Sequence, residues 1–541
     1  MLLTNGRIYT LDARGTVVDT LVVRDGRIAF AGRRADVNPA AGEDALDLGG
    51  RAVLPGLVDA HGHLMHLARA RLSFDARGLA SEEEVARRVG DRASTRPRGE
   101  WITGRNWDQN LWPGGAFPSK ASLDRVAPEH PVALVRVDGH ATWANSAALA
   151  AGGIDRAMTD PPGGIIARDG RGEPTGLLID TAQRLLQVVE PRPSDVQFER
   201  AVRECIADCL AVGLTGIHEM GAELYALASY RRLLERGDFP FRNYVAVAGR
   251  SASTWDHYRQ RGPETLGDGR IVVGALKLLA DGALGSRGAA LHDAYCDDPG
   301  NTGLVLVPGE EVERLTLEAS ALGFQVCVHA IGDRANTLVL DAYERALARV
   351  PRPDHRLRVE HAQVLTEGDI PRFRRLGVLP SMQATHCTSD MAWAGGRLGP
   401  ERLRHAYAWR SLLATGVPIA GGSDFPVESP NPFHGIHASV TRRPRTAARS
   451  RRAFDTRDQP AESDDPGWQP EQRMTRDEAV RSFTIWNAYA ARQEHALGSL
   501  EAGKAADLVV LSEDVFTCPE EHIPDIRPML TLLGGEVVFR G

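Results

Sequence analysis

The sequence predicts an α/β protein: a (β/α)8 barrel with a small β-sandwich domain built from both termini. Helical and extended patterns alternate between residues 54 and 494, giving eight strand segments. Such alternation is typical of parallel βα units, and eight units close a barrel. Both ends of the chain instead show short alternating strands separated by turn residues.

The terminal domain is expected to combine residues 1–53 with residues 495–541. Asn5-Gly6, Asp25-Gly26 and Gly49-Gly50 are hairpin signals between short apolar runs. Residues 507–511 and 529–539 read as further strands. Because the two ends of a chain often lie close together at the surface, we expect one domain from both ends.

The barrel strands are the extended segments of the middle region, and the helices follow them. We expect strands at 54–63, 214–219, 242–247, 271–278, 325–329, 357–361, 378–382 and 417–424, and helices at 195–212, 225–236, 254–260, 310–322, 333–349, 366–375, 401–415 and 476–492. An open doubly wound sheet is the alternative. That fold is typically marked by a G-x-G-x-x-G turn after a strand, and we find none.

Two segments interrupt the repeat. Residues 65–193 form an insertion between the first and second strands, with a strand-like run at 132–137. Residues 441–473 are polar and Pro-rich, with six arginines from Arg442 to Arg452. A solvated loop is favoured over a nucleic-acid patch, because the chain is acidic and no aromatic residues interleave the arginines.

The overall composition indicates a cytoplasmic protein without nucleic-acid or membrane partners. The 64 basic and 71 acidic residues give a net charge of −7 over 541 residues. Residues 1–15 lack the pattern of a secretory signal, and no apolar run approaches a membrane span. The six cysteines form no C-x-x-C pair, which is typical of a reduced compartment.

Polar residues gather at the carboxyl ends of the predicted strands, where a barrel places its active site. The first strand ends in His61 and His63, two residues apart on one face, with Gly62 leaving room between them. The other strand-end residues are Lys277, His329, His361 and Asp424. Any one of them alone reads as structural. Together they are nitrogen and oxygen ligands for a divalent metal such as zinc, and Lys277 is unusual because a buried lysine needs a partner.

The motifs PGLVDAHGH, HAIGD, VEHAQ, GGSDFPV and LGSLEAGKAADLVVL, with a lysine in the fourth strand, resemble those of the amidohydrolase superfamily. DGHATWANSAAL and LKLLADGALGSR resemble its YtcJ-like branch, amidohydrolase family 3, which includes N-substituted formamide deformylase. The resemblance extends over nearly the whole chain, apart from residues 441–473.

The resemblance implies a metal-dependent hydrolase with one or two metal ions per chain. His61, His63 and Asp424 would hold the more buried ion, and His329 and His361 the second. Lys277 would bridge the two as an N-carboxylated lysine. If Lys277 is unmodified, one ion is expected, and Glu219 becomes a substitute ligand. Asp424 is also the expected catalytic residue, because a metal-bound carboxylate can accept the proton of an activated water and pass it to the leaving amine.

Substrate contacts are expected from the insertion, which would cover the barrel mouth, and from the segment after the fourth strand. The candidates are His140, Trp143, Asn145, Asp281, Ser286 and Arg287, with Arg287 available to pair with a substrate carboxylate. Trp101, Trp107 and Trp112 would line an apolar pocket or pack in the core. His386 and Cys387 read as loop residues.

Three functions fit this sequence. The first is hydrolysis of a non-peptide C–N bond in an amide, N-substituted formamide or cyclic amide. The second uses the same site on an ester, lactone or phosphoester. The third is a non-catalytic binding protein on a hydrolase scaffold. The expected partner is a small-molecule substrate, and the family allows a homodimer.

Overall fold

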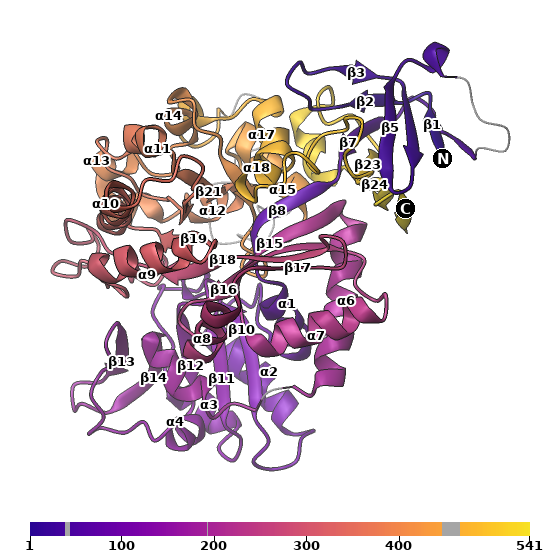
Figure 1. Ribbon diagram of the computed structural model, residues 1–541. Coiled ribbons are helices and arrows are strands. Elements are labelled where there is room, and N and C mark those ends of the chain that lie inside the picture. The colour runs from indigo at the N-terminus through magenta and orange to yellow at the C-terminus, as the bar shows by residue number, and fades with distance from the viewer. Residues whose placement is uncertain (38–43, 192, 446–465) are drawn as a thin grey trace.

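The computed structural model describes residues 1–37, 44–191, 193–445 and 466–541, and its centre is a parallel barrel (Figure 1). The strands follow one another in chain order: β8 (Leu57–Gly62), β15 (Leu214–Ala222), β16 (Arg242–Ala248), β18 (Ile271–Leu279), β19 (Gln325–Ala330), β20 (Arg358–His361), β21 (Leu379–Gln383) and β22 (Ala420–Gly422). All neighbouring pairs along this path are parallel. Directly after β22, Asp424 N donates to His61 O (2.6 Å), so the eighth strand returns to the first. The predicted barrel is confirmed.

The outer layer consists of the helices that connect these strands. They are α6 (Asp195–Ala211), α7 (Leu224–Glu235), α8 (Ala252–Arg261), α9 (Gly309–Ala321), α10 (Asp333–Arg349), α11 (Ile370–Leu376), α14 (Trp409–Ala414), α17 (Arg476–Ser482) and α18 (Ile485–Ala490). The start of α6 is a capping box in which Ser194 and Gln197 satisfy each other's backbone N–H groups. Gly213, at φ +86°, follows its end in a conformation that favours glycine.

Two of the predicted helices are interrupted. Instead of one helix over 401–415, the chain forms α13 (Ala394–Leu403) and α14, and α13 itself is kinked at Gly399, which precedes Pro400. The helix predicted at 476–492 is divided into α17 and α18. Two helices at the carboxyl side of the barrel were not predicted: α12 (Ala384–Asp390) and α15 (Pro432–Thr441).

The two ends of the chain share a pair of sheets. One sheet has the order β5 (Arg27–Gly32), β4 (Thr20–Arg24), β1 (Leu2–Thr4), β6 (Ala45–Asp47). The other has the order β25 (Glu536–Arg540), β24 (Pro528–Leu533), β23 (Leu508–Leu511), β7 (Ala52–Pro55), β2 (Arg7–Tyr9), β3 (Val17–Val18). Leu3 and Leu21 of the first sheet share a core with Leu508 and Leu532 of the second. The N- and C-termini lie near each other in this unit (Figure 1).

The segment 54–63 is two strands rather than one. β7 pairs with β2 and β23 in the terminal unit, whereas β8 begins at Leu57 and pairs with β15 in the barrel. Gly56 lies at the change of sheet, where an added Cβ would meet Thr215 Oγ1 at 2.3 Å. The single apolar run therefore concealed a change of sheet.

The insertion contains more secondary structure than the one strand predicted at 132–137. It holds a six-stranded sheet with the order β13 (Gly164–Arg168), β14 (Pro174–Asp180), β12 (Ala141–Ala144), β11 (Val132–Arg136), β10 (Ile102–Trp107), β9 (Phe74–Asp75). Its helices are α1 (Leu64–Leu72), α2 (Glu82–Ala93), α3 (Lys120–Val126), α4 (Ser146–Ala151) and α5 (Arg184–Gln187). This unit lies on the other side of the barrel from the terminal sheets (Figure 1).

The arginine-rich segment is partly structural. Arg442 is fully buried, with its guanidinium over the ring of Trp409 and Nη1 donating to Tyr407 O (2.9 Å). The expectation of a solvated loop is therefore wrong for Arg442, and residues 446–465 lie outside the described part of the chain. Within the described residues, no helix has the length and apolar composition needed to cross a bilayer.

Candidate metal centre

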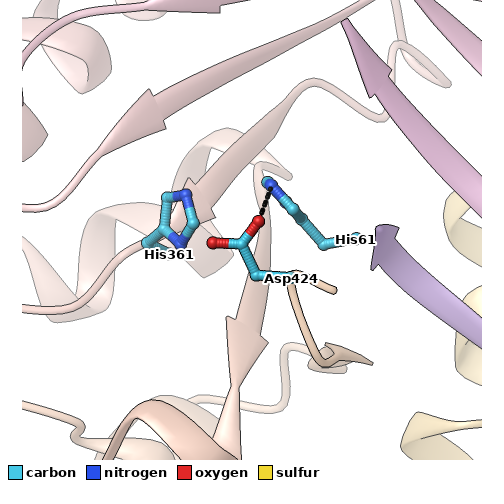
Figure 2. A group of neighbouring side chains, drawn as sticks. All are labelled: His61, His361 and Asp424. Carbon is cyan, nitrogen blue, oxygen red and sulfur yellow. Dashed lines mark ion pairs between the residues drawn. The ribbon is translucent and has the colours of Figure 1, made fainter. Parts of the chain in front are cut away.

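Three buried side chains from well-separated strand ends meet at the rim of the barrel. His61 comes from β8, His361 from β20, and Asp424 follows β22. Each offers one ligand atom, and these atoms all lie within 4.8 Å of one another. Figure 2 shows the Asp424 carboxylate between the two imidazoles, with an ion-pair contact of 3.6 Å from His61 Nε2 to Asp424 Oδ1.

A hydrogen bond on the ring nitrogen that does not face Asp424 fixes the orientation of His61. Its Nδ1 donates to Glu360 Oε2 at 2.6 Å. Burial works to raise the pKa of Glu360, but the charges of Arg358 and His61 hold this pKa well below its usual range, so Glu360 is an acceptor. Burial, reinforced by the charge of Lys277, lowers the pKa of His61 to about 3. His61 is therefore neutral, with the lone pair of Nε2 directed at Asp424, which is the state a metal requires.

His361 is also oriented by a hydrogen bond on Nδ1 and kept neutral by burial. Its Nδ1 lies 2.7 Å from Gln383 Oε1, and the amide nitrogen of Gln383 donates to Ser381 O (3.2 Å), which identifies the oxygen as the atom facing His361. Burial, with the charges of His329 and His61, holds the pKa of His361 well below its usual range. His361 thus also keeps a free nitrogen for a metal.

His63 lies just beyond β8 and caps α1 by position. Its Nδ1 lies 2.6 Å from Met220 O, and its Nε2 lies 2.8 Å from Asp424 Oδ1. Both partners are acceptors, and a neutral imidazole donates to only one of them, so a metal ion at the Asp424 contact would let His63 bind both sides as a neutral ring. Two ligands about 2.1 Å from a tetrahedral ion lie about 3.4 Å apart, a spacing close to the 3.6 Å contact of Asp424 with His61, whereas the 2.8 Å contact with His63 is shorter.

The backbone that leads to Asp424 passes close to the backbone of His61. Asp59 Oδ1 accepts from His61 N (2.9 Å), and Asp59 Oδ2 accepts from Ser423 Oγ (2.6 Å), which ties β8 to the exit of β22. At Gly422 an added Cβ would lie 2.6 Å from Asp59 Oδ1 and from His61 N. Gly62 has another role than predicted, since its missing Cβ makes room for the ring of Phe425.

Lys277 has no hydrogen-bond partner for its Nζ among the described residues, although it is buried. Burial lowers the pKa of this amine, and the nearby carboxylates of Glu360 and Asp424 act against that shift. An orphaned amine beside a His/His/Asp group is costly in a protein interior. A metal, or a modification that turns the amine into a ligand, would remove that cost, so the residues fit the expected group.

His329 is near the three ligands but is turned away from them. Its ring centroid lies 4.5 Å from that of His361. Its Nε2 lies 3.3 Å from Gly282 O and 3.4 Å from Asp281 Oδ1. Burial lowers the pKa of His329, against the effect of Asp281, so it too is neutral.

A cavity of about 960 Å³ opens over this group, between the barrel rim and the insertion. His61, His63, Lys277, His329, His361 and Asp424 all line it. Its size is at the upper end of the roughly 300–1,000 Å³ typical of small-molecule sites. The convergence expected from the strand-end pattern is therefore present, in a chamber that can hold a small molecule.

Among the predicted substrate contacts, His140 lines this cavity. Its Nδ1 lies 2.6 Å from Asp180 Oδ1, and its ring lies 5.2 Å from that of His329. Burial works to lower the pKa of His140, but the hydrogen bond and charge of Asp180 raise this pKa above its usual value. Its Nε2 is available to the chamber.

Trp143 and Asn145 do not line the cavity. Trp143 packs against Trp107 and Trp112 in the core of the insertion and donates to Ser119 O (2.8 Å). Asn145 caps α4 and accepts from Val132 N (2.9 Å). Both are therefore structural, which corrects the expectation. Of the tryptophans considered as pocket residues, Trp101 lines the cavity.

The segment after β18 also differs from expectation. Asp281 is fully buried and accepts from the backbone N–H groups of Ala290, Ile331 and Gly332, so it supports His329 rather than substrate. Arg287 forms an ion pair with Asp297 (2.9 Å) and does not line the cavity, and Ser286 is buried, with Oγ donating to Ala283 O (3.3 Å).

Glu219 was considered as a substitute ligand, but its carboxylate oxygens already accept hydrogen bonds from other protein groups. Its oxygens accept from Met65 N (2.8 Å), Tyr230 Oη (2.9 Å) and Asn243 Nδ2 (2.7 Å). It is not among the residues that line the cavity. It is a buried brace between β15, α1 and α7.

The sequence reasoning missed His386 and Asp390, which lie four residues apart on α12 and line the cavity. His386 Nε2 lies 3.7 Å from Asp424 Oδ2, and its ring stacks 5.9 Å from that of His361. Burial raises the pKa of Asp390 to about 6, although the hydrogen bond from Tyr407 opposes this. The i, i+4 spacing of His386 and Asp390 could have signalled a shared helical face.

Comparisons with known proteins agree with this geometry. A model described as "Amidohydrolase family" matches residues 44–539. The chain is 33% identical to the putative amidohydrolase YtcJ of Bacillus subtilis (strain 168), over 99% of this chain and 98% of that protein. It is 32% identical to the N-substituted formamide deformylase of Arthrobacter pascens, over 99% and 97%.

A crystal structure of an uncharacterized metal-dependent hydrolase from Pyrococcus horikoshii OT3 is similar throughout. It aligns with a TM-score of 0.76 and 25% identity, covering 96% of this chain and 99% of that one. The match of the family model over most of the chain, with two relatives above 30% identity over its full extent, shows that this chain belongs to the amidohydrolase family.

Proposed function

We propose that this protein is a metal-dependent hydrolase that cleaves a non-peptide C–N bond in an amide, N-substituted formamide or cyclic amide. The observation that carries the proposal is the buried His61–His361–Asp424 group on the cavity floor, with the orphaned amine of Lys277 beside it. The deformylase relative acts on an N-substituted formamide by its printed name, which supports the choice of bond.

The ligands are nitrogen and oxygen donors, a set that suits zinc. His61, His63 and Asp424 would hold the first ion, and His361 and His329 the second after His329 turns from Gly282 O. N-carboxylation of Lys277 would supply the bridging oxygens and remove the cost of its buried amine. A divalent metal held there supplies Lewis acidity and lowers the pKa of a coordinated water toward neutrality.

Asp424 is the proton carrier in this proposal. Burial works to raise its pKa, but the hydrogen bond of His63 and the charges of His61 and His361 hold this pKa well below its usual range. The carboxylate is therefore ionised at neutral pH and can accept the proton of the attacking water, then deliver it to the leaving nitrogen. His140, held by Asp180, would donate from Nε2 to the substrate in the chamber.

The deciding experiment combines metal analysis with a matched substrate panel. The purified protein is assayed for bound metal, and native mass spectrometry tests Lys277 for carboxylation. Formamides, amides and cyclic amides are compared with esters, lactones and phosphoesters of the same size. Turnover of the C–N members that is lost in Asp424→Asn supports the proposal.

Other outcomes contradict parts of it. Turnover restricted to the oxygen esters would keep the site and replace the bond. A protein that binds no metal after reconstitution, and turns over nothing, would favour a non-catalytic binding role.

A further inference from the structure

The cavity contains an arginine, Arg105, that has no carboxylate partner among the described residues. Several arginines that line the chamber are neutralised by carboxylates within 3.0 Å: Arg69 by Glu190, Arg96 by Glu100, and Arg136 by Asp108 and Asp138. Arg105 also lines the chamber, but it forms no ion pair within the described ranges. Its only side-chain bond there is from Nε to Asn106 Oδ1 at 3.1 Å.

The position of Arg105 is fixed by the insertion sheet. It is the fourth residue of β10, and the alternation of the strand turns Thr103 and Arg105 to the less buried face. On the other face, an added Cβ at Gly104 would meet Leu134 and Phe74 within 3.0 Å. Asn106, which accepts from Nε, is itself held by Asp75 (2.7 Å). The guanidinium is therefore oriented, while both terminal nitrogens stay available.

The electrostatic setting supports a binding role. Burial, reinforced by the charge of Arg77, lowers the pKa of Arg105 to about 10, so the group is still charged at neutral pH. Arg77 is a second cation and donates to Pro426 O (2.7 Å) and Val427 O (3.0 Å), while the negative charges of Asp424 and Asp75 act on Arg105 without an ion-pair contact among the described residues. The guanidinium is half-buried and has no ion-pair partner among the described residues, and an anionic ligand would compensate its charge.

Arg105 belongs to the same chamber as the candidate metal ligands. The negative charge of Asp424 acts on Arg105, and the positive charge of Arg105 acts on His66 in α1, three residues after His63. Asp424 does not neutralise Arg105, because its carboxylate contacts His63 and His61. A ligand with two ends could thus reach both groups.

We propose that Arg105 binds a carboxylate of the substrate, so that the substrate is an amide or formamide with a carboxylate on its acyl or amine part. This inference rests on the proposed function. The planar guanidinium with two free terminal nitrogens suits bidentate recognition of a carboxylate, and the insertion sheet holds it across the chamber from the barrel rim. The contact would orient the C–N bond toward the His61–His361–Asp424 group.

The test uses matched pairs that differ only by the carboxylate, such as N-formylphenylalanine and N-formylphenethylamine, with the metal-loaded full chain. We expect higher kcat/KM for the acid, and a loss of about 10–100-fold for the acid in Arg105→Met, as for a charged hydrogen bond. The neutral partner should change less than about 3-fold, and Arg105→Lys should be intermediate. Arg87→Met, an exposed arginine of α2, is the matched control.

Several results would overturn the inference. Equal losses on both members of each pair would make Arg105 structural. Arg77, Arg184 and Arg250 also line the cavity without an ion pair among the described residues, and a selective loss in Arg77→Met, Arg184→Met or Arg250→Met would place the acid there instead. A preference for the neutral members would exclude a carboxylate site.

A direct binding measurement separates this inference from the proposed function. Calorimetry with 3-phenylpropanoate needs no turnover. Binding that weakens 10-fold or more in Arg105→Met supports the carboxylate site even if no amide is hydrolysed, in which case only the proposed function fails. Binding that is absent, or unchanged in the variant, overturns the inference even if neutral amides are good substrates.

Discussion

Two layers of the barrel interior contain buried charged side chains, and the layers differ in how completely protein groups pair those charges. In the lower layer, Arg358 has protein partners on several sides: Ala60 O (2.7 Å), Ser381 Oγ (3.0 Å), Glu360 Oε1 (2.8 Å) and His218 Nδ1 (2.9 Å). In the rim above it, Lys277 has no partner for Nζ within the described residues.

The difference indicates what each layer is for. A buried ion pair whose partners all lie within the protein specifies packing, and removal of one partner is strongly unfavourable. A buried group with an incomplete set of partners is favourable only when something else completes it. Glu360 connects the layers, since it contacts both Arg358 and His61. The lower layer therefore acts as the support on which the proposed metal ligands are oriented.

The largest expected effect is on the rim. Asp424→Asn should lower kcat for the best C–N substrate by about 10³–10⁴-fold, because it removes the proton acceptor and a metal ligand together. Thermal unfolding of the metal-free protein should stay close to that of the parent. A folded Asp424→Asn variant with parental turnover would refute the assignment.

The second largest expected effect is on the free energy of unfolding, and it distinguishes the lower layer from the rim. Arg358→Met should destabilise the metal-free protein by about 3–5 kcal/mol, because it leaves the buried charge of Glu360 without its guanidinium partner and with only the hydrogen bond from neutral His61. Lys277→Met is the matched change in the rim, and it should cost less than about 1 kcal/mol while lowering the bound metal. Urea unfolding and elemental analysis measure both. Equal destabilisation by the two variants would contradict the distinction.

The pH dependence of the metal-free protein should follow the neutral histidines of both layers. Burial lowers the pKa values of His61, His218, His329 and His361. The unfolded chain therefore takes up protons first as the pH falls below about 6.5, and stability falls with it. Asp59, whose pKa burial raises to about 7, acts in the opposite direction as a single group.

Between pH 7.5 and 5.5 the free energy of unfolding should drop by at least about 1.4 kcal/mol, the value for one net proton over one pH unit. Bound zinc should raise stability at each pH without removing this drop, because the native histidines are already unprotonated in this range. Urea midpoints across the range, with and without zinc, test this. A midpoint independent of pH in the metal-free protein would show that the histidines are not buried in the neutral form.

The smallest expected effect on stability concerns Glu219, a buried carboxylate whose hydrogen-bond partners all lie within the protein. Glu219→Gln should cost about 1–2 kcal/mol, because it disturbs the contacts with Met65 N, Tyr230 and Asn243. The metal content should not change. A fall in bound metal without loss of stability would restore Glu219 as a ligand.

The sequence was informative where a local pattern and a strand end coincide. The alternation of apolar strands and helices predicts the barrel, and His61, His361 and Asp424 follow from their places at strand ends. The pattern failed where tertiary contacts decide. Nothing local distinguishes the strand of the terminal sheet from that of the barrel on either side of Gly56, or shows that Trp143 points into the insertion core.

The pairing of charges was also beyond the sequence. Arg287 and Arg105 look alike as single arginines, but Asp297 neutralises the first, while the second faces the chamber. His386 was missed because α12 is short and its residues read as a loop after β21. Such assignments depend on which distant side chains arrive at the same place, and only the folded chain provides that.

The junction at Gly56 has a consequence for synthesis of the chain. The strand before it, β7, lies between β2 and β23, and Gly56 N donates to Asp507 O (2.9 Å). The ribosome makes β7 early and β23 only after the barrel. The strand β7, which leads into β8, thus gains its second neighbour only after all eight barrel strands have been made. A nascent chain that ends before residue 508 should contain all eight barrel strands and leave β7 paired with β2 alone.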